Sequence, residues 1–114
     1  MIRFGKSVAG RESQAVDLFN AATHYFQEQV AAGVIRSFEP FLMATSDLEE
    51  ELGFFIIQGS PADVFALMQD EAYRDLLQKG LYLVEHLSTD LLTVGEGIAD
   101  QLQRSAKVRA ELGI

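Results

Sequence analysis

Three stretches of the chain have the apolar pattern of β-strands. Residues 2–8 alternate apolar and polar positions, which predicts a strand with one mainly apolar face. Residues 34–43 contain Pro40, which cannot donate a sheet hydrogen bond, so this strand is expected at an edge. Residues 53–59 hold four consecutive large apolar residues between glycines. That run predicts a central strand buried on both faces.

Two long stretches repeat apolar residues every three or four positions, which predicts helices. The first covers residues 11–32. The second begins after Ser60, the expected N-cap, with Pro61 at the first helical position. We expect the second helix to break near residues 70–71 and to end at Gly80.

The C-terminal part of the chain is less regular. Residues 81–87 form a short apolar run that fits either a strand or a buried helical turn. Residues 88–95 alternate and are expected to form the last strand, whereas residues 98–112 predict a helix with a thin apolar stripe. We therefore expect one α+β domain over residues 1–97 and a helical extension over residues 98–114.

The order of these elements is the split βαβ pattern, βαββαβ, followed by an extra C-terminal helix. Right-handed crossovers place the first and third strands at the centre of a four-stranded antiparallel sheet, and the second and fourth at its edges. Both helices then cover one face of the sheet, yet the third strand is apolar on both faces. An uncovered apolar face calls for a partner, so we expect a homodimer whose sheets pack face to face.

Composition and charge narrow the classes of function. The chain of 114 residues has nine Lys and Arg against seventeen Asp and Glu, a net charge of -8, so nucleic acid and anionic membranes are poor partners. The absence of cysteine excludes thiolate chemistry and leaves the redox compartment undetermined. No signal sequence and no apolar run of membrane-spanning length is visible, so a cytoplasmic protein is expected.

Three side chains are candidates to bind a ligand in a pocket between sheet and helices. Tyr25 lies at the margin of its helix stripe, where the ring can be buried while the hydroxyl reaches a cavity. Glu39 shares a strand face with Ile35 and Phe41, so it is either a buried functional carboxylate or an edge charge that discourages aggregation. His86 could act as a general base or could lie partly exposed at a strand entrance.

Two other polar features have simpler interpretations. His24 lies opposite the apolar stripe of its helix and one turn before Glu28, which predicts a solvated ion pair. The acidic loop at residues 44–52 does not have the ligand spacing of a calcium loop. No glycine-rich phosphate loop is present, because the stretch 95–97 lacks a third glycine at the needed spacing and Glu96 would repel phosphate. We expect no metal and no cofactor.

The strands and the Ser60-capped helix resemble the dimeric α+β barrel superfamily, in which ferredoxin-like subunits pair through their sheets. The resemblance covers about residues 2–97 and includes the paired glycines Gly95 and Gly97. It implies a ferredoxin-like subunit within a dimeric α+β barrel. Members include antibiotic-biosynthesis monooxygenases and other cofactor-free monooxygenases, haem-degrading enzymes and lactone isomerases.

No catalytic residue carries over from that superfamily. The haem-degrading members use a Trp, which this chain lacks, and members with a His-Asp pair place the His near the first strand, where this chain has Phe4 to Ser7. Two functions then follow. The first is a homodimer that binds a small apolar or aromatic metabolite between sheet and helices. The second is a cofactor-independent monooxygenase or isomerase with His86 or Glu39 as base and with Tyr25 or Tyr82 positioning an oxygen.

Overall fold

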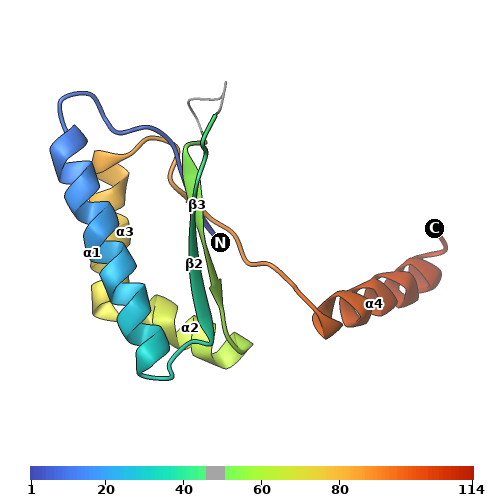
Figure 1. The fold of residues 1–114 in the computed structure, drawn as a ribbon. Coiled ribbons are helices and arrows are strands. Elements are labelled where there is room, and N and C mark those ends of the chain that lie inside the picture. Colours follow the sequence, from blue (N-terminus) through green and yellow to red (C-terminus); the bar gives the residue numbers. More distant parts are fainter. Residues whose placement is uncertain (46–50) are drawn as a thin grey trace.

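The computed structural model describes residues 1–45 and 51–114. It is an α+β fold on a four-stranded antiparallel sheet, as predicted. The elements in chain order are β1 (Ile2–Phe4), α1 (Glu12–Ala31), β2 (Ser37–Leu42), β3 (Gly53–Gln58), α2 (Pro61–Gln69), α3 (Glu71–Leu83), β4 (Ser88–Thr89) and α4 (Glu96–Leu112) (Figure 1).

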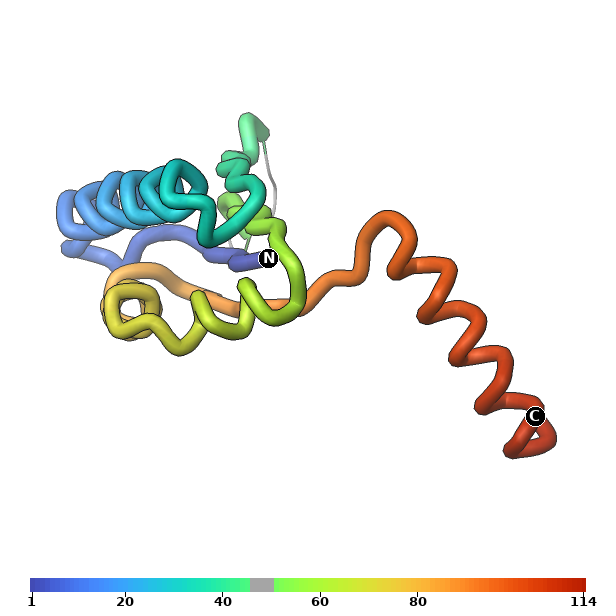
Figure 2. The backbone as a smooth tube through the Cα atoms, turned by 90° about the horizontal axis from the view of Figure 1, so that it is seen from below, coloured from blue at the N-terminus to red at the C-terminus, as the bar shows by residue number. Residues whose placement is uncertain are grey.

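The strand order is β2-β3-β1-β4, with every neighbouring pair antiparallel. The first and third strands are therefore central, and Pro40 lies on edge strand β2, as the sequence predicted. Helices α1 and α3 lie side by side over one face of the sheet (Figures 1 and 2). Helix α4 projects away on the other side of the sheet. Within the described residues, no helix is both long and apolar enough to cross a membrane.

The face of the sheet that meets the helices carries the core. Ile2 pairs with Phe55 and Phe4 with Gly53, so alternation directs all four toward α1 and α3. Gly53 is required here because an added Cβ would lie 2.5 Å from the Phe41 carbonyl oxygen and 2.9 Å from the Phe4 ring. The absence of a side chain at this position lets the two central strands and β2 pack closely.

Phe26 of α1 is the centre of this core and is only 2 % exposed. Its ring meets those of Tyr25, Phe38, Phe55 and Tyr73, with ring centroids 5.1 to 6.2 Å apart. These rings come from two helices and two strands. One side chain therefore ties both layers together.

The opposite face of the sheet is open. Phe54 and Ile56 alternate with the buried residues of β3 and point away from the helices. Phe41 on β2 pairs with Phe54, and the two rings stack with centroids 4.8 Å apart, although Phe41 is 41 % exposed. The central strand is thus apolar on both faces, as predicted, and within the described residues no helix packs on this face.

The second helical region follows its predicted start and break. The Ser60 hydroxyl accepts a hydrogen bond from the Asp63 amide at 3.1 Å, which caps α2. Asp70 has extended backbone angles and separates α2 from α3. The predicted end at Gly80 is wrong, since α3 continues to Leu83. Gly80 is buried, and a Cβ there would lie 2.9 Å from the Leu87 side chain, so close packing explains this glycine.

The predicted first and last strands need correction. β1 ends at Phe4 rather than at residue 8, and the edge strand β4 covers only Ser88–Thr89. A bridge between Ser7 and Val84 keeps the same antiparallel register, so the run at 81–87 is helical at its start and sheet-like after Leu83.

The physical reason for this shift is burial. Val84 and Leu87 pack against the core, whereas Leu91 and Leu92 are 65 % and 53 % exposed. Residues 90–95 are therefore a linker, and the terminal helix begins at Glu96, two residues before its predicted start. The predicted acidic loop at 44–52 falls largely on residues 46–50, which lie outside the described residues.

Candidate functional site: a cavity between sheet and helices

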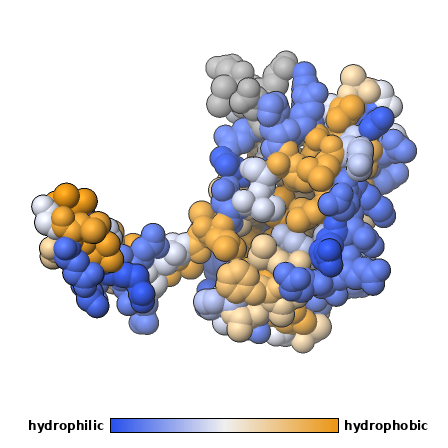
Figure 3. All heavy atoms as spheres, turned by 180° about the vertical axis from the view of Figure 1, so that it is seen from behind, coloured by the Kyte–Doolittle hydropathy of each residue, from blue (hydrophilic) through white to orange (hydrophobic). Residues whose placement is uncertain are grey.

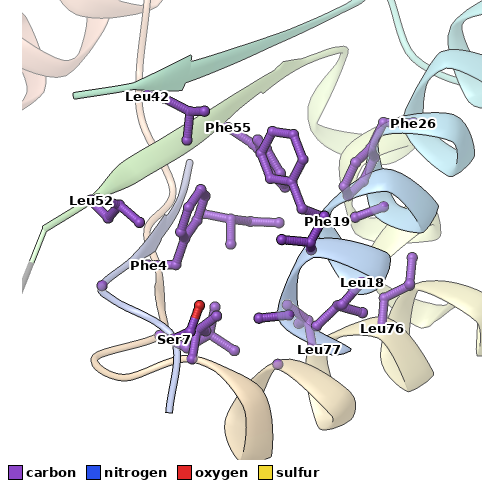
Figure 4. A pocket seen from close by; sticks show the side chains of 18 of the residues that line it. Phe4, Ser7, Leu18, Phe19, Phe26, Leu42, Leu52, Phe55, Leu76 and Leu77 are labelled. Carbon is purple, nitrogen blue, oxygen red and sulfur yellow. The ribbon is translucent and has the colours of Figure 1, made fainter. Parts of the chain in front are cut away.

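A cavity of about 350 Å³ lies between the sheet and helices α1 and α3. Figure 4 shows side chains from both layers arranged around it. Phe4 and Phe55 come from the sheet, Phe19 from α1, and Leu76 and Leu77 from α3. The cavity is therefore enclosed by the same two layers that form the core.

Small residues on α1 leave the space that the cavity occupies. Ala15, Phe19, Ala22 and Phe26 recur at steps of three and four residues, so they share the inward side of the helix. The two alanines alternate with the two phenylalanines along this side. Phenylalanine reaches the sheet, whereas alanine does not, and the gap remains over the alanines.

The cavity wall is almost wholly apolar. Among the described residues that line it, only Ser7 and Tyr73 have polar side chains, and none is charged. Burial raises the pKa of the Tyr73 phenol, so that side chain is neutral across the physiological range. The Ser7 hydroxyl lies at the edge of the cavity (Figure 4). Ser7 and Tyr73 are thus the lining residues in this part of the chain whose side chains can form hydrogen bonds.

Three lining residues also reach the protein surface. Val16, Leu42 and Leu52 line the cavity and are 58 %, 60 % and 43 % exposed. Val16 comes from the first turns of α1, Leu42 from the end of β2, and Leu52 from the position just before β3. Apolar side chains that are exposed and also line a cavity mark its entrance.

Tyr25 is buried as predicted, but it does not line this cavity. Its hydroxyl donates a hydrogen bond to the Asp70 carboxylate at 2.6 Å, and its ring packs edge-on against Phe26 at 5.2 Å. Burial, with Asp70 as the second cause, raises the pKa of Tyr25. The bond joins α1 to the break between α2 and α3, so Tyr25 holds the two helical segments together.

Glu39 is exposed and lies on the open face of the sheet, opposite Ile56. It shares that face with Phe41, as predicted. The expectation that Ile35 shares the same face is wrong, because β2 begins only at Ser37 and Ile35 is 3 % exposed in the core. Glu39 does not line the cavity.

His86 is exposed and has a positive φ of 55°, which is uncommon for a residue with a Cβ. It sits in the turn between Val84 and β4, and the neighbouring backbone groups of Glu85 bond to Gly5 and Lys6. It does not line the cavity. The structure therefore does not bring Tyr25, Glu39 and His86 together at one site.

The residues that do form the cavity were not identified from the sequence as ligand-binding. Phe19 and Ala22 were assigned only to the helix stripe, and Ser7 and Tyr73 had no role. The signal that could have found them is the alternation of small and large residues on the inward side of α1. The apolar character of a ligand site between sheet and helices was itself an expectation from the sequence.

The predicted solvated pair on α1 is confirmed. His24 Nε2 lies 2.9 Å from Glu28 Oε1, and the side chains are 74 % and 60 % exposed. Within residues 1–45 and 51–114, no three His, Asp or Glu side chains gather as a possible metal site. No protein-family model, curated protein or solved structure matches the chain.

Proposed function

We propose that the protein is a homodimer that binds a small, neutral, apolar or aromatic molecule in the cavity between its sheet and helices α1 and α3. The observation that carries this proposal is the apolar cavity of about 350 Å³ with an exposed apolar entrance. Small-molecule sites are concave, mainly apolar and furnished with few polar groups. The volume is near the lower end of the usual range for such sites.

The lining favours a neutral ligand. Moving a charged group out of water without a partner costs several kcal/mol, about the whole affinity of a small ligand. The described part of the wall has no charged side chain to offset that cost. Ser7 and Tyr73 can instead orient one hydroxyl, carbonyl or ether group.

The aromatic end of the cavity favours a planar ligand. The rings of Phe4, Phe19 and Phe55 lie with centroids 5.3 to 6.2 Å apart in tilted or edge-on arrangements. A ligand ring placed among them would meet both ring faces and ring edges, which is the geometry that aromatic pairs prefer.

For the architecture, we propose a ferredoxin-like subunit that forms a homodimer through the open face of its sheet. The proposal is supported by the central position of the first and third strands and by helices on one sheet face only. The second crossover consists of two helices here, and β4 is only two residues long. The open face with Phe41, Phe54 and Ile56 is the surface that a second copy would cover.

The enzymatic alternative has less support. Glu39 and His86, its two candidate bases, are both exposed, and neither lines the cavity. Tyr25 and Tyr82 were its candidates for positioning an oxygen, but the hydroxyl of Tyr25 is bonded to Asp70 and Tyr82 is 66 % exposed. A general base must reach the proton that it removes. Binding without catalysis is the function that we propose.

Titration with N-phenyl-1-naphthylamine, a neutral aromatic probe whose fluorescence rises in apolar surroundings, tests the binding function. Ala22→Leu would fill part of the cavity, whereas Ala21→Leu makes the same change on the exposed side of α1. We expect saturable binding by the wild-type protein, roughly tenfold weaker binding by A22L, which corresponds to about 1.4 kcal/mol, and unchanged binding by A21L. No saturable binding by the wild type, or equal binding by A22L, would contradict the proposal.

A further inference from the structure

Helix α4 has an apolar side with nothing packed on it. Figures 1 and 2 show the helix well apart from the sheet and from α1 to α3, on the open-face side of the sheet. None of its residues is buried. Its large apolar residues are all between 44 % and 67 % exposed, namely Ile98, Leu102, Val108 and Leu112.

These four residues fall on one side of the helix, because at 100° per residue they lie within about 120° of arc. Figure 3 shows hydrophobic residues on one side of the projecting helix and hydrophilic residues on the other. An isolated amphipathic helix of this length gains most of its stability from packing of its apolar side. We therefore expect the apolar side of α4 to pack on another surface.

The open face of the sheet has a matching apolar strip on β2 and β3. Phe41, Phe54 and Ile56 form this strip. The neighbouring central strand β1 presents Arg3, which is held by Asp90 at 3.0 Å and by Glu51 at 3.4 Å. A face-to-face sheet contact would bury these ion pairs as well, whereas a helix lying over β2 and β3 leaves them at the rim in water.

The two surfaces also agree in length. A helix of 17 residues is about 25 Å long, and strands of six residues are about 20 Å long. A helix about 10 Å wide would cover roughly 250 Å². Two exchanged helices and the two faces that they cover would bury about 1,000 Å² in total, the lower limit for a specific interface.

The charges are complementary. Residues 96–114 contain three cations and three anions, so the net charge of -8 resides entirely on residues 1–95. The cations lie from the middle of α4 onward, at Arg104, Lys107 and Arg109, and Lys107 also pairs with Glu111 at 4.0 Å. On the open face, Glu39 is exposed and makes no ion pair within the described residues. The basic half of the helix thus fits an acidic body beside the apolar strip.

The linker carries the helix away from its own sheet. Residues 90–95 leave the sheet at β4, and the strip on β2 and β3 lies two to three strand spacings away, about 10 to 14 Å, on the same sheet. Six residues span at most about 20 Å. Crossing its own sheet would use much of that reach, and the linker instead carries α4 into the space in front of the open face (Figures 1 and 2).

We propose that α4 of each chain packs over the β2–β3 strip on the open face of a second copy, so that the dimer exchanges its C-terminal helices. This inference rests on the homodimer proposed above and specifies which element covers the open face. It gives the C-terminal extension a function, which is to hold the two copies together.

Two charge substitutions in the full-length chain test the exchange. Leu102→Glu places a charge in the apolar side of α4, and Gln103→Glu makes the same addition one residue away on its polar side. Both positions are exposed, so folding of the body is unaffected. In light scattering at micromolar concentration we expect a wild-type dimer, a Q103E dimer and at least a tenfold weaker L102E dimer. A wild-type monomer would overturn both the homodimer and the exchange; an undisturbed L102E dimer would overturn the exchange alone.

Cross-linking tests which surface α4 covers, because the chain has no cysteine of its own. A Leu102→Cys chain is mixed with a mass-tagged Ile56→Cys chain and oxidised. We expect a disulfide between the two different chains, and none when Gln103→Cys replaces Leu102→Cys. A doubly substituted chain that carries Leu102→Cys and Ile56→Cys and closes only an internal disulfide would overturn the exchange, since α4 would then cover its own sheet.

Discussion

The two faces of the sheet come from the same strands but differ in what covers them. On the helix side, Ile2, Phe4 and Phe55 are all less than 10 % exposed and surround a cavity. On the other side, Phe41 is 41 % exposed although its ring stacks on Phe54. Alternation along a strand decides which side chains share a face, but packing partners decide whether that face is buried. We propose the covered face as a site for a small molecule and the open face as a site for another chain.

The largest difference between the two faces is expected from truncating an aromatic ring on each. Phe26→Ala removes the most buried ring of the covered face, so the free energy of unfolding should fall by about 3 to 5 kcal/mol. When the protein is dilute enough to be monomeric, Phe41→Ala on the open face should lower the free energy of unfolding by only about 1 kcal/mol, because that ring is then partly in water. Urea unfolding measures both values. Equal losses would mean that the open face is buried as deeply as the core.

A smaller effect is expected from the bond that holds the helices over the covered face. Tyr25→Phe removes the hydroxyl that donates to Asp70, and hydrogen bonds to charged groups contribute about 1.5 to 3 kcal/mol. We expect the free energy of unfolding, measured in urea, to fall by an amount near the lower end of that range. An unchanged urea midpoint would show that the hydrogen bond from Tyr25 to Asp70 does not stabilise the position of α1.

The same tyrosine predicts a dependence on alkaline pH. The pKa of Tyr25 is raised in the folded protein above the ordinary value of 10.0. Below pH 10 the phenol is protonated in both states, and the stabilisation is fully present. As the pH rises past 10, the unfolded chain ionises first, so the free energy of unfolding should fall. The fall should be smaller in Tyr25→Phe, and an equal fall in both proteins would contradict this assignment.

The smallest effect is expected on the solvent side of α1, away from both faces. His24→Gln removes an ion pair whose two side chains are more than half exposed, so the free energy of unfolding should change by less than about 0.5 kcal/mol. Thermal unfolding at pH 6 and pH 8 measures it. A larger change would mean that this side of the helix has a partner.

Much of the fold could be predicted because local signals agreed with burial. Pro40 marked an edge strand, Ser60 a helix start and the run at 53–59 a central strand. The last strand was predicted too long, at residues 88–95 instead of Ser88–Thr89, because alternation alone does not show which residues find a packing partner. The chain joins the sheet where Val84 and Leu87 find packing partners, Leu87 against Gly80, and where Ser88 and Thr89 pair with β1.

The candidate site was harder to predict than the fold. Tyr25, Glu39 and His86 were chosen for their chemistry, yet the cavity is built from residues with little chemistry, such as Ala22 and Phe19. A cavity is a property of what the side chains leave unfilled, and a sequence lists only what is present. The spacing of alanines on α1 carries part of that information, but the depth of the gap depends on how far the helices stand from the sheet.

The most direct test of the binding site is a methyl NMR spectrum of the protein titrated with N-phenyl-1-naphthylamine. Binding in the cavity should shift the methyl signals of Leu76 and Leu77, which line it, and leave those of Leu112 and Ile114 on the far side of the molecule unchanged. Shifts confined to α4 or to Ile56 on the open face, or no shifts at all, would contradict the assignment of the covered face as the ligand site.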